Sequence, residues 1–145
     1  MKEYVVGFAF DHSCKSVLLI YKRTPEWQRG LINGIGGKIK KGELPIQAMV
    51  REFKEETGVE TDNSDWIYFC LMTAGKEEIY CYYMIGGAHD ATSMEDEVVR
   101  WFEVGDDNDF ISNLNWLIPL ALEDDLQKNK GINLFVKATY KKEKE

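Results

Sequence analysis

Three glutamates, Glu52, Glu55 and Glu56, have the spacing in this sequence that most directly suggests chemistry. On a helix, side chains three and four residues apart lie on one side, so all three carboxylates can face one cleft. Carboxylate oxygens are hard ligands of the kind that divalent cations such as Mg²⁺ bind. The spacing predicts a preformed cation site. The alternative is a solvated acidic face on which Arg51 pairs with Glu55 and nothing is bound.

A helix over residues 45–57 is expected to position these acids. Pro45 suits the first turn of a helix, and Gly58 suits the position just after its end. Between them, four apolar residues recur at the i, i+3, i+4 and i+7 positions of one helical face: Ile46, Met49, Val50 and Phe53. Such a helix can bury this stripe while it holds the acids at the edge of a cleft.

The rest of the chain predicts a mixed sheet that packs between helical layers, an α/β fold. Strands are expected at 4–10, 16–21, 35–39, 66–72, 79–85, 98–104 and 132–140. The range 107–128 is expected to be helical, with Pro119 either kinking the helix or starting a second one after Asn115. Residues 1–140 are interpreted as one domain and residues 141–145 as a charged, solvated tail.

Composition and charge narrow the class of protein. The 145 residues are 44% hydrophobic and carry a net charge of −7, which fits one globular domain and gives no basic field for nucleic-acid polymers or anionic membranes. Three cysteines without C-x-x-C spacing predict buried free thiols. No secretory leader or membrane-spanning run is recognisable. We expect a cytoplasmic protein, either monomer or homodimer, with a small-molecule partner; an anionic substrate would require a cation.

The surroundings of the three glutamates follow a longer pattern, G-x5-E-x7-R-E-U-x-E-E-x-G-U, in which U is a bulky apolar residue. Its positions are filled by Gly37, Glu43, Arg51, Glu52, Phe53, Glu55, Glu56, Gly58 and Val59. This segment resembles the Nudix box, with Phe53 a slightly unusual choice. The resemblance implies a Nudix-type α/β/α sandwich and a hydrolase in which water attacks a phosphorus of a nucleoside diphosphate derivative. The expected cofactor is Mg²⁺, with Mn²⁺ as a substitute.

The resemblance also implies metal ligands and a general base. Glu52, Glu55 and Glu56 would bind the metal together with the carbonyl of Gly36, the glycine before the box. The base would be Glu52 or Glu56, or else a glutamate in a later loop. In this sequence the loop candidates are Glu95 and Glu97.

Two further box residues are expected to organise the loop around the acids. Arg51 presents a rigid fork that can clamp carboxylates from two segments, and Glu43 would be one of them. Gly37 is expected to give the backbone freedom for a close approach at the start of the box, and both Gly37 and Trp27 are candidates for substrate contacts.

The substrate is expected to bind outside the box. Residues 27–38, from Trp27 to Lys38, look like the W-N-G-x-G-G-K approach of Nudix enzymes that clear oxidised purine nucleoside triphosphates, although Leu31-Ile32 separate the elements. That likeness makes Asn33 a residue that reads the base, against the alternative of a turn residue before Gly34.

Several other side chains are candidates for substrate contacts. Lys38, Lys22 and Arg23 could steer phosphates or simply form a solvated face. Phe110 and Trp116 could stack on a base or belong to the core, and Asn113 stands where the likeness calls for an acid.

The leading hypothesis is a nucleoside triphosphate pyrophosphatase acting on 8-oxo-dGTP or a related purine. The alternatives are a Nudix hydrolase of ADP-ribose, a nucleotide sugar or a dinucleoside polyphosphate, and a non-catalytic domain that senses nucleotides.

Overall fold

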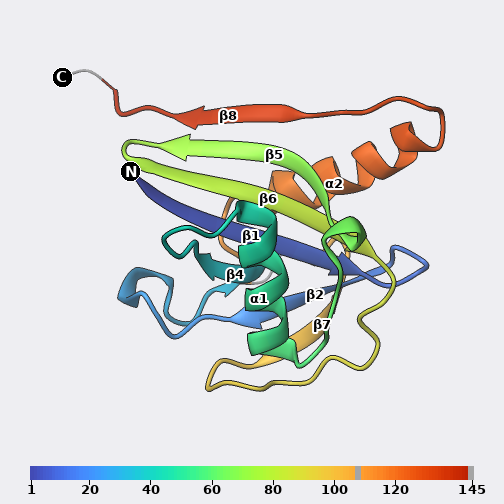
Figure 1. The fold of residues 1–145 in the computed structure, drawn as a ribbon, viewed down its shortest axis with the longest axis horizontal. Coiled ribbons are helices and arrows are strands. Elements are labelled where there is room, and N and C mark those ends of the chain that lie inside the picture. Colours follow the sequence, from blue (N-terminus) through green and yellow to red (C-terminus); the bar gives the residue numbers. More distant parts are fainter. Residues whose placement is uncertain (107–108, 144–145) are drawn as a thin grey trace.

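The computed structural model describes residues 1–106 and 109–143, which form a mixed sheet between two helices. The strands are β1 (Lys2–Phe10), β2 (Ser16–Tyr21), β3 (Ile32–Asn33), β4 (Ile35–Lys38), β5 (Ile67–Ala74), β6 (Glu77–Ile85), β7 (Val99–Glu103) and β8 (Val136–Tyr140). The helices are α1 (Pro45–Thr57) and α2 (Leu114–Lys128), with short 3-10 helices η1 (Glu26–Gln28) and η2 (Asn63–Asp65). In Figure 1, α1 crosses the near face of the sheet and α2 lies behind it. The predicted α/β/α arrangement is confirmed.

Strand β1 organises the sheet, whose order is β3-β2-β1-β6-β5-β8, with β4 paired to β1 and β7 paired to β2. One edge of β1 runs parallel to β6 over its whole length. Its other edge pairs with β4 from Tyr4 to Gly7 and with β2 at Ala9 and Phe10. The chain therefore places β4, which leads into the Nudix-like segment, next to the middle of the sheet.

Alternation along β1 divides the core into two layers. Val6, Phe8 and Phe10 pack on the side of α2, whereas Val5 and Ala9 pack on the side of α1. The stripe expected on α1 is buried as predicted: Met49 and Phe53 are fully buried, and Ile46 and Val50 pack partly buried against the same cluster. Burial of this stripe fixes which way the acidic side of α1 faces.

The second helix begins later than the sequence predicts. Residues 107 and 108 lie outside the described part of the chain, and the next residues pair with β3: Ile32 donates to the Asp109 carbonyl at 2.8 Å and Ile111 donates to the Ile32 carbonyl at 2.9 Å. These backbone hydrogen bonds replace the first helical turn. Helix α2 then runs unbroken with Pro119 inside it, so no second helix starts there. The exposed ring of Pro119 removes only one helical donor.

The structure also tests the predictions for the cysteines and for the last strand. All three cysteines are free as predicted; Cys70 and Cys81 are buried, and Cys14 is only partly buried. The last strand is shorter than expected and begins at Val136, where it pairs in parallel with β5. Neither described helix combines the length and apolarity needed to cross a bilayer.

Candidate active site

Strand β4 and helix α1 bring the ends of the Nudix-like segment together. A β-carbon at Gly37 would lie 2.5 Å from Oε1 of Glu52, so only glycine lets this carboxylate approach the strand so closely. At the other end of α1, Gly58 adopts a left-handed conformation (φ 77°), and its N–H bonds to the Lys54 carbonyl. The two glycines expected from the sequence therefore have separate jobs: close approach and helix termination.

Arg51 is the hub that connects the strand, the loop and the helix. Its Nε and Nη2 donate to the two carboxylate oxygens of Glu43 at 2.8 and 2.9 Å. Nη1 donates to Glu52 at 2.9 Å and to Glu55 at 3.2 Å, and Nη2 also reaches the Lys38 carbonyl at 3.1 Å. The hydrogen bonds from Arg51 hold the pKa of Glu43 below its ordinary value. The pair with Glu55 expected for a solvated face is thus one part of a larger, partly buried cluster.

Glu56 differs from the other box acids because it has no such partner. Its carboxylate is about half-buried, and Oε2 finds no hydrogen-bond donor among the residues that the structure describes. Burial raises the pKa of Glu56 to about 7, and repulsion from Glu97 and Glu52 adds to the shift, while Lys22 opposes it. Burial also raises the pKa of Glu52. These acids lie close together with too little positive charge to balance them, so their donor set fits a divalent cation.

The acids are not gathered around a single point. Within the described residues, no group of three or more His, Cys, Asp or Glu side chains is arranged as a complete metal cage. Arg51 engages Glu52 and Glu55, and the side chain of Glu55 is 42% exposed. Glu52 and Glu56 are therefore the partly buried carboxylates of α1, and Glu55 lies at the solvent edge.

The loop after β6 brings one of its two glutamates close to the box. Its backbone is joined to the end of α1, since Thr92 N–H bonds to the Thr57 carbonyl and Met94 N–H to the Glu56 carbonyl. Glu97 lies close enough to Glu56 to raise the pKa of that acid, but its own carboxylate accepts hydrogen bonds from Lys22, Arg23 and Thr24. Glu95 is exposed on the same loop.

A cavity of about 570 Å³ adjoins the box on the α2 side of the sheet. Most of the residues predicted to bind substrate line it, namely Asn33, Gly37, Lys38, Lys22, Trp27 and Asn113, together with Gly36. The residues Gly36–Lys38 belong both to this cavity and to the segment that contacts the box acids. Strand β4 thus connects the acids on one face to the cavity on the other.

Three predicted substrate residues lie elsewhere. Phe110 packs edge-on against Phe102, with ring centroids 5.7 Å apart, and Trp116 is partly buried against the core under α2. Arg23 is exposed and contributes its backbone N–H to Glu97. Phe110 and Trp116 therefore pack, partly buried, against the core, which is the alternative that the sequence left open for them.

The two asparagines of the cavity have different hydrogen-bond states. Asn33 bonds to the backbone N–H of Gly34 at 2.7 Å and donates to Gln28 at 3.3 Å. Asn113 has only a weak contact, at 3.7 Å, from its Nδ2 to the Met72 sulfur, and its Oδ1 is buried without a partner among the described residues. Asn113 therefore offers the cavity an acceptor that a ligand could use.

Some cavity residues had no signal in the sequence. Tyr140 and Glu77 line its far end because β8 and β6 pair on either side of β5, which places both opposite Ala74. Only the strand pairing reveals them. Gln28 lies within the 27–38 segment, and its contact with Asn33 could have been suspected from that position.

Comparison with known proteins agrees with this geometry. The NUDIX domain family matches residues 3–125 of the chain. Among solved structures, the mutator MutT protein of Bacillus halodurans is similar, with a TM-score of 0.72 and 19% identity over 97% of this chain and 90% of that one. A MutT structure from work on Aliivibrio salmonicida and Vibrio cholerae has a TM-score of 0.70 and 19% identity, over 84% of this chain and 98% of that one.

A third similar structure has a bound ligand. The NUDIX domain of Shewanella oneidensis NrtR, complexed with ADP ribose, has a TM-score of 0.70 and 21% identity over 83% of this chain and 86% of that one. No curated protein sequence matches the chain. The match to the family model, the fold and the complete box lead to one conclusion: the chain belongs to the Nudix family.

Proposed function

We propose that the chain is a Mg²⁺-dependent pyrophosphohydrolase that converts a purine nucleoside triphosphate, oxidised dGTP in particular, to the monophosphate and pyrophosphate. The observation that carries the proposal is the unpartnered acceptor of Asn113 in a cavity that shares Gly36–Lys38 with the acid cluster. A nucleotide lying across β4 would have its base in the cavity and its phosphates beside Glu52 and Glu56.

Base selection follows from the hydrogen-bonding capacity of the cavity. Guanine has an acceptor nitrogen at position 7, whereas its 8-oxo form carries an N–H there. With its amide oriented as in the contact between Nδ2 and Met72, Asn113 Oδ1 would pair with the added donor and would face an acceptor in ordinary guanine. Asn33, which can both donate and accept, would read a second position on the base. The cavity therefore favours the oxidised purine.

Different side chains would bind the metal, balance the phosphate charge and accept the proton. Glu52, Glu55 and Glu56 would hold Mg²⁺, which when bound offsets phosphate charge and lowers the pKa of water. Lys38 and Lys22 line the cavity where the phosphate chain would pass and balance its charge. Oε2 of Glu56 is buried without a hydrogen-bond donor among the described residues, so it can accept the proton of the attacking water.

A substrate screen in the presence of Mg²⁺ tests this proposal. Ordinary and oxidised nucleoside triphosphates, ADP-ribose, nucleotide sugars and dinucleoside polyphosphates would be compared by release of monophosphate and pyrophosphate. We expect the highest kcat/KM for an oxidised purine triphosphate and no turnover in EDTA. Inactivity on every triphosphate would exclude the proposed reaction.

The length of the cavity favours a second candidate, a larger nucleoside diphosphate derivative such as ADP-ribose or a dinucleoside polyphosphate. The lining extends from β4 through β1, β6 and β5 to Tyr140 on β8. Four interstrand steps of about 4.8 Å make roughly 19 Å, room for more than one ring. If such a ligand is the substrate, Tyr140→Ala should raise its KM and leave that of a triphosphate unchanged. A domain that senses nucleotides without hydrolysis would bind in the same screen but release no product.

A further inference from the structure

Glu97 makes an unusually complete set of contacts for a loop carboxylate. Oε1 accepts from Lys22 Nζ at 3.0 Å, and Oε2 accepts from the backbone N–H groups of Arg23 at 2.6 Å and Thr24 at 3.2 Å. The side chain of Glu97 is only 13% exposed. About 75 positions of sequence separate the donors from the acceptor. This acid therefore fixes one remote segment of backbone.

The segment that Glu97 holds is a wall of the cavity. Lys22, Pro25, Trp27 and Gln28 all line it. The 3-10 helix in this wall buries none of its own residues, and Trp27 is 70% exposed, so packing contributes little to its position. The wall must depend on hydrogen bonds at its ends, and Glu97 supplies three of them.

The loop that carries Glu97 is itself held by hydrogen bonds to β2, within the loop and to α1. Just before β7, Val98 accepts from the Tyr21 N–H at 2.9 Å, and Val99 N–H bonds to the Ser93 hydroxyl at 3.0 Å. The same loop bonds through Met94 to the carbonyl of Glu56 at the end of α1. Glu97 thus connects the frame around the catalytic helix to the wall of the cavity.

We propose that Glu97 is a positioning residue that holds the Lys22–Gln28 wall of the nucleotide cavity, and that it acts neither as the general base nor as a metal ligand. This inference rests on the proposed function, because it assigns the wall to nucleotide binding. Two N–H donors occupy Oε2, and an ammonium group occupies Oε1. Protonating this carboxylate, or sharing it with a cation, would weaken the hydrogen bonds that hold the wall.

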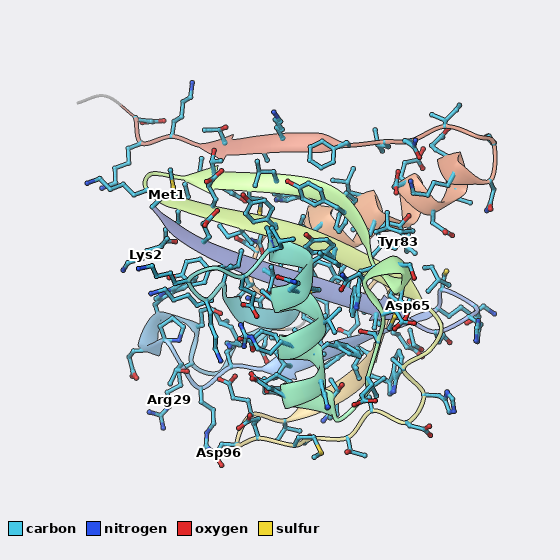
Figure 2. The ribbon with its side chains drawn as sticks, in the orientation of Figure 1. Met1, Lys2, Arg29, Asp65, Tyr83 and Asp96 are labelled. Carbon is cyan, nitrogen blue, oxygen red and sulfur yellow. The ribbon has the colours of Figure 1, made fainter. Side chains whose placement is uncertain are left out.

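The first test needs no ligand. Trypsin cleavage after Lys22, Arg23 and Arg29 would be followed in wild type, Glu97→Gln, Glu97→Ala and the control Asp96→Asn. Asp96 is the exposed neighbour on the same loop, and Figure 2 shows it pointing away from the molecule. We expect faster cleavage at these three sites in Glu97→Ala, a smaller increase in Glu97→Gln, and wild-type rates in Asp96→Asn. Equal rates in all four proteins would overturn the proposal.

The second test separates positioning from chemistry. In Glu97→Gln, KM for the best nucleotide should rise about tenfold, as expected when charged hydrogen bonds that shape a binding site are lost, while kcat and the affinity for Mn²⁺ stay near wild type. Weaker Mn²⁺ binding would show that Glu97 is a ligand. A lower kcat at unchanged KM would show that it is the base.

A double-mutant cycle with Lys22→Met adds a third measurement. Lys22 and Glu97 should be coupled in KM, because the ion pair is one of the three bonds that hold the wall. Additive effects of Lys22→Met and Glu97→Gln would contradict the proposal. If wild type hydrolyses no nucleotide, the proposed function fails, and the trypsin result still decides whether Glu97 holds the wall.

Discussion

The Nudix box and the substrate cavity are built in opposite ways. The box acids lie on one helix, and most of their contacts come from residues within 15 positions of them, such as Glu43 and Arg51. The cavity draws residues from β1, β3, β4, β5, β6, β8, η1 and α2. A local segment can specify a reaction class, whereas a surface assembled from eight elements specifies the substrate. The difference explains why the first could be predicted from spacing and the second only in part.

The substitution Glu56→Gln should have the largest effect and tests whether the box governs hydrolysis separately from nucleotide binding in the cavity. Loss of the unpartnered box carboxylate should lower kcat by about 10²–10⁴-fold, while KM for nucleotide changes little because the cavity is untouched. Steady-state kinetics with saturating Mg²⁺ measure both. Glu60→Gln is the matched control, since Glu60 is an exposed acid beyond the same helix that pairs only with Lys54 in the described structure. A large rise in KM would contradict the separation.

Arg51→Lys should give the next largest effect. Lysine cannot keep the bidentate contact with Glu43 while also reaching Glu52 and Glu55, so we expect kcat/KM to fall about 10–100-fold, together with a lower melting temperature. The same substitution at Arg29, which is exposed and has only a 3.8 Å contact with Glu26, should leave both unchanged. Full activity in Arg51→Lys would mean that the hub is not needed to arrange the acids.

The substitution Asn113→Leu tests whether the cavity selects the base. It removes the unpartnered acceptor, so kcat/KM for the oxidised purine should fall about tenfold and that for the ordinary purine should change little. Competition assays with paired nucleotides measure the ratio. Asn115→Leu, at an exposed neighbouring position of α2, serves as the control. An equal loss for every nucleotide would remove Asn113 from base selection.

The smallest expected effect is on stability. Because burial raises the pKa of Glu56 from its ordinary 4.5 to about 7, the folded protein binds a proton more tightly than the unfolded chain, and stability falls as pH rises from 4.5 to 7. In EDTA, Glu56→Gln should therefore melt higher than wild type at pH 8, and this advantage should disappear below pH 4.5. Thermal melts across this range would show it. A constant difference at every pH would argue against the raised pKa.

The elements that the sequence predicted well are those whose signals are local. The stripe from Ile46 to Phe53, the proline at the start and the glycine at the end determined α1 to the residue. The start of α2 was missed because Asp109 and Ile111 bond to β3, which competes with helix formation and is invisible without the strand. The same holds for Glu97, whose donors lie more than 70 positions away, and for Tyr140, which reaches the cavity through a parallel pairing. Long-range pairing leaves no local pattern to read.

The shared strand β4 has a consequence for how such a protein can change during evolution. Neither Gly36 nor Gly37 can accept a side chain without a clash. A β-carbon at Gly36 would collide with the Val5 carbonyl, and one at Gly37 would collide with the Glu52 carboxylate. Substitutions at the cavity wall can alter ligand preference while sparing hydrolysis. Substitutions around Arg51 can impair hydrolysis while sparing ligand preference. Changes in β4 would impair both at once. This short strand is therefore where the two properties are least free to diverge independently.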